Sequence, residues 1–197
     1  KGEVLRVPYD GLPVDVWWRY DWRADLRWNA LKLLTTLRQE SHDGRRWNLI
    51  GHSQGGLVII LASKLAASPR EFASMVGRVV LVGAPIAGTV RALEAILFGR
   101  EDMGEENAPG LLAAARTWPA LYQMLPSWPS ALDNNEKPRP REKQFNQPGG
   151  WGKLMNGAHP IQEDLLTRAR ETQALLTGPF SHLAGVDTLT VMGKRQM

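Results

Sequence analysis

One serine in this sequence lies in a pattern that suits nucleophilic chemistry. Residues 51–55 read GHSQG, a G-x-S-x-G pattern centred on Ser53. An apolar strand pattern at 47–50 runs directly into it, and an apolar helix pattern at 57–67 follows it. A serine on a tight turn from strand to helix has a strained backbone and projects its hydroxyl from the edge of the sheet. The pattern therefore predicts Ser53 as the nucleophile of an acyl-transfer reaction.

The neighbours of Ser53 suit the same chemistry. The helix begins with unpaired N–H groups, and we expect the N–H of Gln54 to donate to the oxyanion of a tetrahedral intermediate. Gly51 and Gly55, two residues either side of Ser53, should leave room for strand and helix to approach without a Cβ clash. His52 adjoins the nucleophile, but neighbouring residues on such a turn point in different directions. We therefore expect His52 to pack or to support the site rather than to act as the base.

A serine needs a histidine base, and a carboxylate to orient that base. His159, in a loop after the cap described below, and His182, before an expected turn and strand, are weak candidates for the base. Both positions are more typical of surface or packing histidines. His42, in a charged turn, is a weaker candidate still, and Asp187 precedes its strand, which is the wrong end for the acid.

The elements that must position Ser53 alternate between strand and helix. β-branched and aromatic residues predict a strand at 14–20, and further strands are expected at 47–50, 78–82 and 188–192. A helix should run over 162–176. Continuous apolar strands that alternate with helices indicate a parallel sheet with helices on both faces. The first helix, capped by Asp25, has apolar residues spaced by three and four: Leu26, Ala30, Leu33, Leu34 and Leu37.

Between residues 86 and 160 this alternation stops. Amphipathic segments at 90–98 and 110–125 are separated by turns, and 133–152 is dense in Pro, Gly, Asn and charge, which predicts a flexible loop. We expect a core at 1–89, a helical cap insertion at 90–160 and a return to the core at 161–197. The apolar composition of 90–128 suits a cover over an acyl pocket, and equally an insertion with a small core of its own.

Composition and charge exclude several classes of function. Lys+Arg 24 against Asp+Glu 20 gives a net charge of +4, spread along the chain, which is too weak for nucleic-acid binding and is compatible with transient contact at an anionic membrane surface. The apolar run at 57–62 is far shorter than the roughly 20 residues of a bilayer span. With no cysteine and dispersed histidines, no disulfide, metal site or cofactor is expected. The compartment stays open, with a slight preference for the bacterial cytoplasm.

Three stretches together resemble the lecithin:cholesterol acyltransferase-like family of α/β hydrolases. Residues 20–23 read YDWR, residues 51–58 read GHSQGGLV and residues 81–89 read LVGAPIAGT, in the family's order; residues 125–127 are a weaker match to its LP turn. The resemblance covers most of 14–126. It implies an α/β-hydrolase sheet with a cap, and ester or acyl chemistry on lipids through an acyl-serine intermediate on Ser53.

The sequence departs from the family where the catalytic triad should be completed. In the family the acid follows the strand expected here at 188–192, and the histidine comes later, whereas this chain ends at Met197. No His-Gly segment precedes Ser53 to supply a second oxyanion N–H. We therefore expect a segment of a longer enzyme, with the acid and base outside it and with exposed apolar surface at both edges of its sheet.

Two other functions stay open on these residues. An esterase or thioesterase for a small soluble substrate would share the elbow but have a compact, polar pocket under its cap. A catalytically silent hydrolase-fold module used for binding would lack the acid and the base. The sequence does not distinguish hydrolysis from acyl transfer, and it leaves the substrate and the oligomeric state open.

Overall fold

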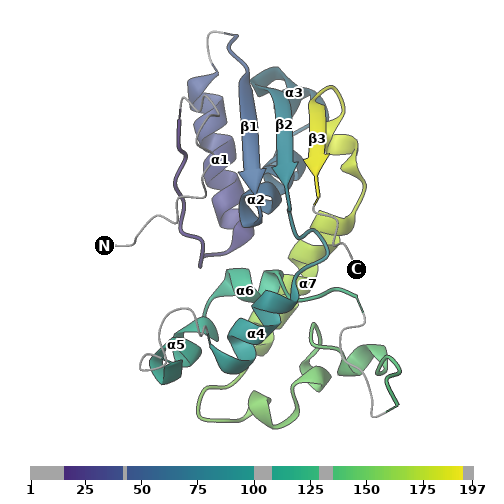
Figure 1. Ribbon diagram of the computed structural model, residues 1–197. Helices are drawn as coiled ribbons and strands as arrows, with labels where there is room; N and C mark the ends of the chain where they lie inside the picture. The colour runs from purple at the N-terminus through teal and green to yellow at the C-terminus, as the bar shows by residue number, and fades with distance from the viewer. Residues whose placement is uncertain (1–15, 42–43, 100–107, 129–134, 193–197) are drawn as a thin grey trace.

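The fold is built on a sheet of three parallel strands in the order β1-β2-β3. The computed structural model describes residues 16–41, 44–99, 108–128 and 135–192. Its strands are β1 (Trp47–His52), β2 (Val76–Val82) and β3 (Asp187–Val191), and their carboxyl ends all point towards a group of cap helices (Figure 1). A parallel sheet flanked by helices confirms the predicted α/β class.

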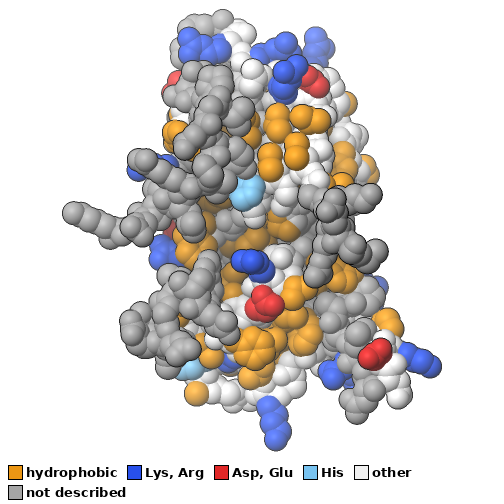
Figure 2. Space-filling view, viewed as in Figure 1, with side chains coloured by type: hydrophobic (Ala, Val, Ile, Leu, Met, Phe, Trp, Pro, Cys, Tyr) orange, Lys and Arg blue, Asp and Glu red, His pale blue; other side chains and the backbone are white. Residues whose placement is uncertain are grey.

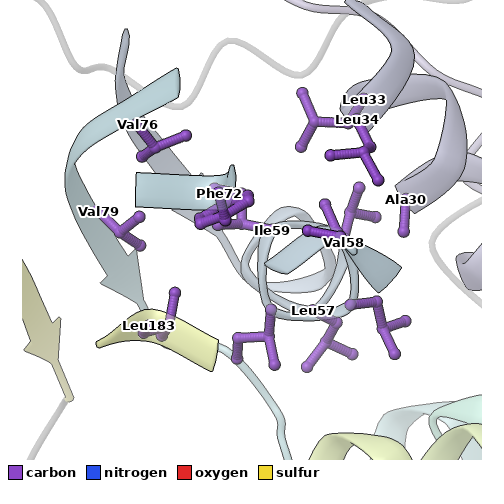
Figure 3. Packing of buried hydrophobic residues seen from close by; sticks show 14 of the residues in the cluster. Ala30, Leu33, Leu34, Leu57, Val58, Ile59, Phe72, Val76, Val79 and Leu183 are labelled. Atoms are coloured by element: carbon purple, nitrogen blue, oxygen red, sulfur yellow. The ribbon is translucent and has the colours of Figure 1, made fainter. Parts of the chain in front are cut away.

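Two helices carry most of the core. α1 (Leu26–Glu40) packs on α2 (Gln54–Leu65), and α2 lies against β1. Asp25 caps α1 as predicted, because its carboxylate accepts a hydrogen bond from the N–H of Arg27 at 2.8 Å. Residues 56–63 of α2 are all buried, which fits the place of this helix between α1 and the sheet (Figure 3). The apolar residues predicted for the first helix are all buried: Leu26, Ala30, Leu33, Leu34 and Leu37.

A short helix, α3 (Pro69–Met75), precedes β2 and is absent from the sequence prediction. The Ser68 hydroxyl accepts a hydrogen bond from the N–H of Glu71 at 3.1 Å, and proline stands at the first helical position. Ser-Pro-x-Glu is a recognisable start signal for a helix, so the sequence did contain the information.

The described helices cover one face of the sheet. On that face Val79 and Leu81 of β2 are buried. On the other face, Ile50 is 46% exposed and Leu189 is 55% exposed, and both lie in register with Val80. Figure 2 shows hydrophobic side chains at the surface over the strands. Within the described ranges no helix covers the second face, and no further strand pairs with β1 or β3, which is compatible with a partial α/β fold (Figure 1).

The strand predicted at 14–20 is wrong for residues 16–20, which form no strand. Trp17 is 68% exposed, whereas Trp18 packs on the core and donates its Nε1–H to Thr36 Oγ1 at 3.3 Å. β-branched and aromatic residues favour a strand only where a neighbouring strand offers backbone partners. None pairs with residues 16–20 in the described part of the chain. Residues 14 and 15 lie outside it.

The cap follows β2 and lies beyond the carboxyl ends of the strands (Figure 1). It contains α4 (Val90–Phe98), as predicted, and the expected segment at 110–125 is divided into α5 (Ala108–Ala115) and α6 (Pro119–Gln123). The division has a local cause, because a residue before proline avoids the helical region, and Trp118 has an extended ψ of 110°.

The loop expected at 133–152 is folded where it is described. Residues 135–155 include the short 3-10 turns η3 (Arg141–Lys143), η4 (Pro148–Gly150) and η5 (Gly152–Met155). Trp151 is 3% exposed, and its Nε1–H donates to the Phe145 carbonyl at 2.8 Å. A buried aromatic side chain thus anchors this segment to the cap, and the predicted flexibility of 133–152 stays a prediction. Residues 133 and 134 lie outside the described part.

The long helix α7 (Glu163–Thr177) joins the cap to the core, and η6 (Phe180–Leu183) leads from it towards β3. Leu166, in its first half, belongs to the buried cluster of the cap, and Leu176, near its end, belongs to the core cluster. The helix therefore packs on both parts, and the boundary drawn between residues 160 and 161 stays a prediction.

Candidate active site

Ser53 occupies the turn between β1 and α2 and has a strained backbone. Its φ of 50° and ψ of −122° lie outside the regions that non-glycine residues favour. Strain of this kind costs roughly 1–3 kcal/mol and persists only where the surroundings fix it. The Ser53 N–H donates to the Val82 carbonyl at 2.8 Å, and the Ser53 carbonyl accepts from the N–H of Gly56 at 3.0 Å. β2 and the first turn of α2 thus fix the backbone of Ser53.

Two glycines permit the close approach of strand and helix at this turn. A Cβ on Gly51 would lie 2.7 Å from the Cα of Gly56, and a Cβ on Gly56 would lie 2.6 Å from the Cβ of Ala84. The expected steric need at Gly51 is therefore met. The expectation for Gly55 is wrong, because a Cβ there would lie 3.8 Å from Tyr20 Oη, which is an ordinary contact. The second required glycine is Gly56, the next residue in the same GHSQGG run.

The Ser53 hydroxyl is not used to cap its helix. Asp25, Ser68 and Thr89 each accept a backbone N–H at the start of α1, α3 and α4, whereas the half-buried Ser53 side chain makes no such bond to α2. Gln54 is the first residue of α2, so no carbonyl one turn earlier in the helix accepts its N–H. The start of α2 therefore presents a hydroxyl and an N–H together at the carboxyl edge of the sheet, where the helix dipole favours negative charge.

The segment from Tyr20 to Arg23, the YDWR of the sequence, lies beside this turn. The Tyr20 hydroxyl donates to Gln54 Oε1 at 3.4 Å, and Gln54 Nε2 donates to the Trp22 carbonyl at 2.8 Å. Sequence reasoning singled out YDWR but missed its contact with the elbow, and nothing in residue types or spacing signals a contact between positions 34 residues apart.

The ionisable groups of this segment have two different environments. Burial raises the pKa of Tyr20 to about 12, so its hydroxyl keeps its proton into the alkaline range. Hydrogen bonds from Arg23 lower the pKa of Asp21, with Nε to Oδ1 at 2.9 Å and Nη2 to Oδ2 at 3.1 Å. Arg23 and Asp21 thus form an ion pair at the exposed end of this segment.

The candidate bases do not lie next to Ser53 in this arrangement. The carbonyl of His159 accepts from Arg116 Nη1 at 2.7 Å, and Arg116 Nε also donates to Ile96 O, which places His159 near the far end of α4. His182 lies in η6, which packs on α3 at the amino end of the sheet, and its buried Nδ1 has no partner in the described residues. His42 lies outside the described residues.

Two further ionisable residues lie on the strands of the sheet. His52, which we expected to pack or to support the site, is the last residue of β1 and is exposed beside Ser53. Asp187 begins β3 and accepts a hydrogen bond from Arg78 Nε at 2.7 Å, at the end of the sheet opposite Ser53. The end of β3 is the part that lies near the site, because Val191 is paired with Val82 at the carboxyl edge.

A groove of about 970 Å³ follows the open edge of β1. Its walls come from residues 16–18, from Tyr20, from α1 and α2 and from the strand itself, and it reaches Gly51, His52 and Gly55 at the elbow. No residue pattern predicted this groove, since the pocket was expected beneath the cap. Within the described residues no cluster of three or more acidic or histidine side chains could hold a metal ion. No described helix has both the length and the apolar character needed to cross a bilayer.

The chain resembles known proteins at the level of a family. The family model for lecithin:cholesterol acyltransferase matches residues 4–148, which include YDWR, the Ser53 elbow and α4 to α6. Searches of the curated proteins and of the solved structures gave no match. The family match spans well over half of the chain, and with the strand–serine–helix elbow in place the chain belongs to the lecithin:cholesterol acyltransferase family.

Proposed function

We propose that Ser53 is the nucleophile of a hydrolase or acyltransferase that acts on lipid ester bonds. Family membership already indicates lipid acyltransferase or esterase activity. The observation that supports Ser53 is its strained turn, in which a serine at a helix start leaves its side chain out of the cap. Strain of this kind is concentrated at functional sites, where the surrounding structure fixes it.

The proposed reaction has two stages. Ser53 Oγ attacks the acyl carbonyl carbon and loses its proton to a base, and the Gln54 N–H donates to the oxyanion that forms. The C–O bond to the leaving alcohol then breaks, and the alcohol takes up a proton as the acyl-serine forms. Water or an acceptor alcohol attacks the acyl-serine and gives its proton to the base, the acyl C–Oγ bond breaks, and Ser53 Oγ takes up a proton. Water produces hydrolysis and the alcohol produces transfer, so exclusion of water from the site decides between them.

The base and the acid are not assigned among the described residues. β3 ends at the same edge of the sheet as Ser53, and the family resemblance implies an acid that follows this strand.

A series of p-nitrophenyl esters with acyl chains of increasing length tests the proposal. The assay uses the 197-residue chain and the complete gene product side by side, each with its Ser53→Ala variant. We expect hydrolysis that increases with chain length, an acyl adduct on Ser53 by mass spectrometry, and loss of both in Ser53→Ala. Preference for the shortest esters would instead support a small-molecule esterase. Activity that survives in Ser53→Ala would overturn the assignment.

A catalytically silent lipid-binding module is the second candidate. It is favoured by one observation, that neither His159 nor His182 lies near Ser53 in the described structure. If it is correct, wild-type protein and Ser53→Ala will bind lipid vesicles equally and neither will form an acyl adduct. An adduct on Ser53 would rule it out.

A further inference from the structure

We propose that the Gln54 side chain, held between Tyr20 and Trp22, is a positioning group that keeps the Ser53 turn in its strained form. The inference rests on the proposed function, since it assigns to Gln54 and Tyr20 a part in presenting the nucleophile and the oxyanion N–H. Gln54 would thus contribute twice, with its backbone N–H at the oxyanion and with its side chain as an anchor.

The amide of Gln54 is bonded at both of its ends. Its Oε1 accepts the Tyr20 hydroxyl at 3.4 Å, and its Nε2 donates to the Trp22 carbonyl at 2.8 Å. The Tyr20 oxygen also lies beside Gly55, 3.8 Å from the point where a Cβ would be. Tyr20 and Trp22 therefore contact the two residues that follow Ser53.

The segment that holds Gln54 is itself fixed to the cap and to α1. The Trp22 ring lies edge-on to Trp118 of the cap, with centroids 5.0 Å apart. The Arg23 carbonyl accepts from the N–H of Ala120 in α6 at 3.3 Å, and the Asp21 carbonyl accepts from Asn29 Nδ2 of α1 at 2.8 Å. Gln54 is consequently anchored to a fixed support rather than to a free loop.

Such an anchor has a physical task at this turn. A residue with φ of 50° stays strained only if its neighbours are held from several sides. The Ser53 N–H donates to Val82 of β2, and the Ser53 carbonyl accepts from the N–H of Gly56. Both bonds therefore join the turn to β2 and α2 only. The two hydrogen bonds of the Gln54 side chain restrain the turn from the side of residues 20–23. They also fix the residue whose N–H donates to the oxyanion in the proposed reaction.

The test compares Gln54→Leu and Tyr20→Phe with a matched control, Thr36→Val. The control removes the Thr36 hydroxyl that accepts Trp18 Nε1–H at 3.3 Å, a bond to the same N-terminal segment that leaves Gln54 untouched. Two properties are measured in the complete gene product: amide hydrogen exchange of the peptide that contains Ser53 and Gln54, and the rate at which a fluorophosphonate labels Ser53. Esterase kcat and KM are measured on the same proteins.

We expect Gln54→Leu to accelerate local exchange and to slow labelling and kcat by about tenfold, as the loss of two hydrogen bonds suggests, with KM within about twofold. Tyr20→Phe should slow labelling by only about twofold to threefold, since one long bond is lost. Thr36→Val should change neither property. Unchanged exchange in Gln54→Leu, or faster exchange with an unchanged labelling rate, would overturn the positioning role. Failure of the wild type to label at all would instead overturn the proposed function, so the two failures are distinct.

Discussion

The core around Ser53 and the cap differ in what their buried side chains contact. In the core, residues 56–63 of α2 are all buried, and most of them are aliphatic side chains or glycine that pack on α1 and the sheet (Figure 3). In the cap and along its border with the core, buried polar side chains reach backbone groups. Arg116 Nε donates to Ile96 O at 3.0 Å, Gln173 Nε2 donates to Leu125 O at 2.6 Å, and Gln123 Oε1 accepts the N–H of Leu26 at 2.7 Å.

The difference shows how each part restrains its backbone. In the core, apolar packing and glycine contacts bring strand and helix so close that a strained serine can be held between them. In the cap, short helices leave many unpaired ends, and buried side chains satisfy them. The stability of the core should therefore depend mainly on the volume of its buried side chains. The stability of the cap should depend mainly on its buried hydrogen-bond donors and acceptors.

The largest expected effect is that of a cavity in the core. Ile60 is fully buried in α2, and Ile60→Ala should lower the free energy of unfolding by about 4 kcal/mol, from lost apolar burial and an unfilled cavity. Leu31→Ala, on the exposed side of α1, is the control and should change it by less than about 0.5 kcal/mol. Urea denaturation measures both. Equal effects would contradict the assignment of α2 to the centre of the core.

A second prediction concerns the glycines of the elbow. Gly51→Ala places a Cβ 2.7 Å from the backbone of Gly56. It should lower the free energy of unfolding by about 3 kcal/mol, because backbone atoms must move. Gly55→Ala should be neutral within about 1 kcal/mol, since the added methyl makes an ordinary contact. Thermal unfolding of the two variants checks this. If Gly55→Ala proves the more damaging, the account of strand–helix approach is wrong.

The cap should respond to loss of a single buried amide. Gln123→Leu leaves the N–H of Leu26 without its acceptor and Thr172 Oγ1 without the donor 3.1 Å away, at a cost of about 2 kcal/mol. Thr172→Val removes one of these contacts and should lower the free energy of unfolding by less than Gln123→Leu does. The double variant should lower it by less than the sum of the two single effects. A double-mutant cycle in urea measures the coupling, and strict additivity would show that the network is not cooperative.

The smallest effect should come from a surface ion pair. Arg38 donates to Glu71 Oε1 at 2.8 Å, and this hydrogen bond, with that from the N–H of Ala67, lowers the pKa of Glu71. The contribution of Glu71 should be present above the ordinary glutamate pKa of 4.5 and lost as the pH falls through the lowered pKa. Glu71→Gln should cost about 0.5 kcal/mol at pH 7 and less at low pH. If Glu71→Gln lowers the free energy of unfolding by more as the pH falls, the assigned pH dependence has the wrong sign.

Much of the fold follows from local patterns in the sequence. The period of the apolar residues predicted α1, and the apolar run before Gly51 predicted β1, because each pattern matches one element that is buried on a defined side. The strand predicted at 14–20 failed for residues 16–20, because strand propensity needs a partner that lies far away in the chain.

The candidate site could be predicted only in part. The elbow motif located Ser53 and the N–H of Gln54, since both lie within one strand–turn–helix unit. The close contact that requires a glycine at position 56 and the hydrogen bond from Tyr20 to Gln54 both depend on how distant segments pack. Residue spacing carries no such information. The family match extends the sequence reading to lipid chemistry without assigning a base.

The most direct test of the account is labelling with a fluorophosphonate probe, with the modified residue mapped by mass spectrometry. The 197-residue chain and the complete gene product are compared, each beside its Ser53→Ala variant. Ser53 as an activated nucleophile predicts a single adduct on Ser53 in the complete protein and none in Ser53→Ala. An adduct on another residue of the complete protein would contradict the assignment of Ser53 as the nucleophile. So would the absence of any adduct when the complete protein is folded.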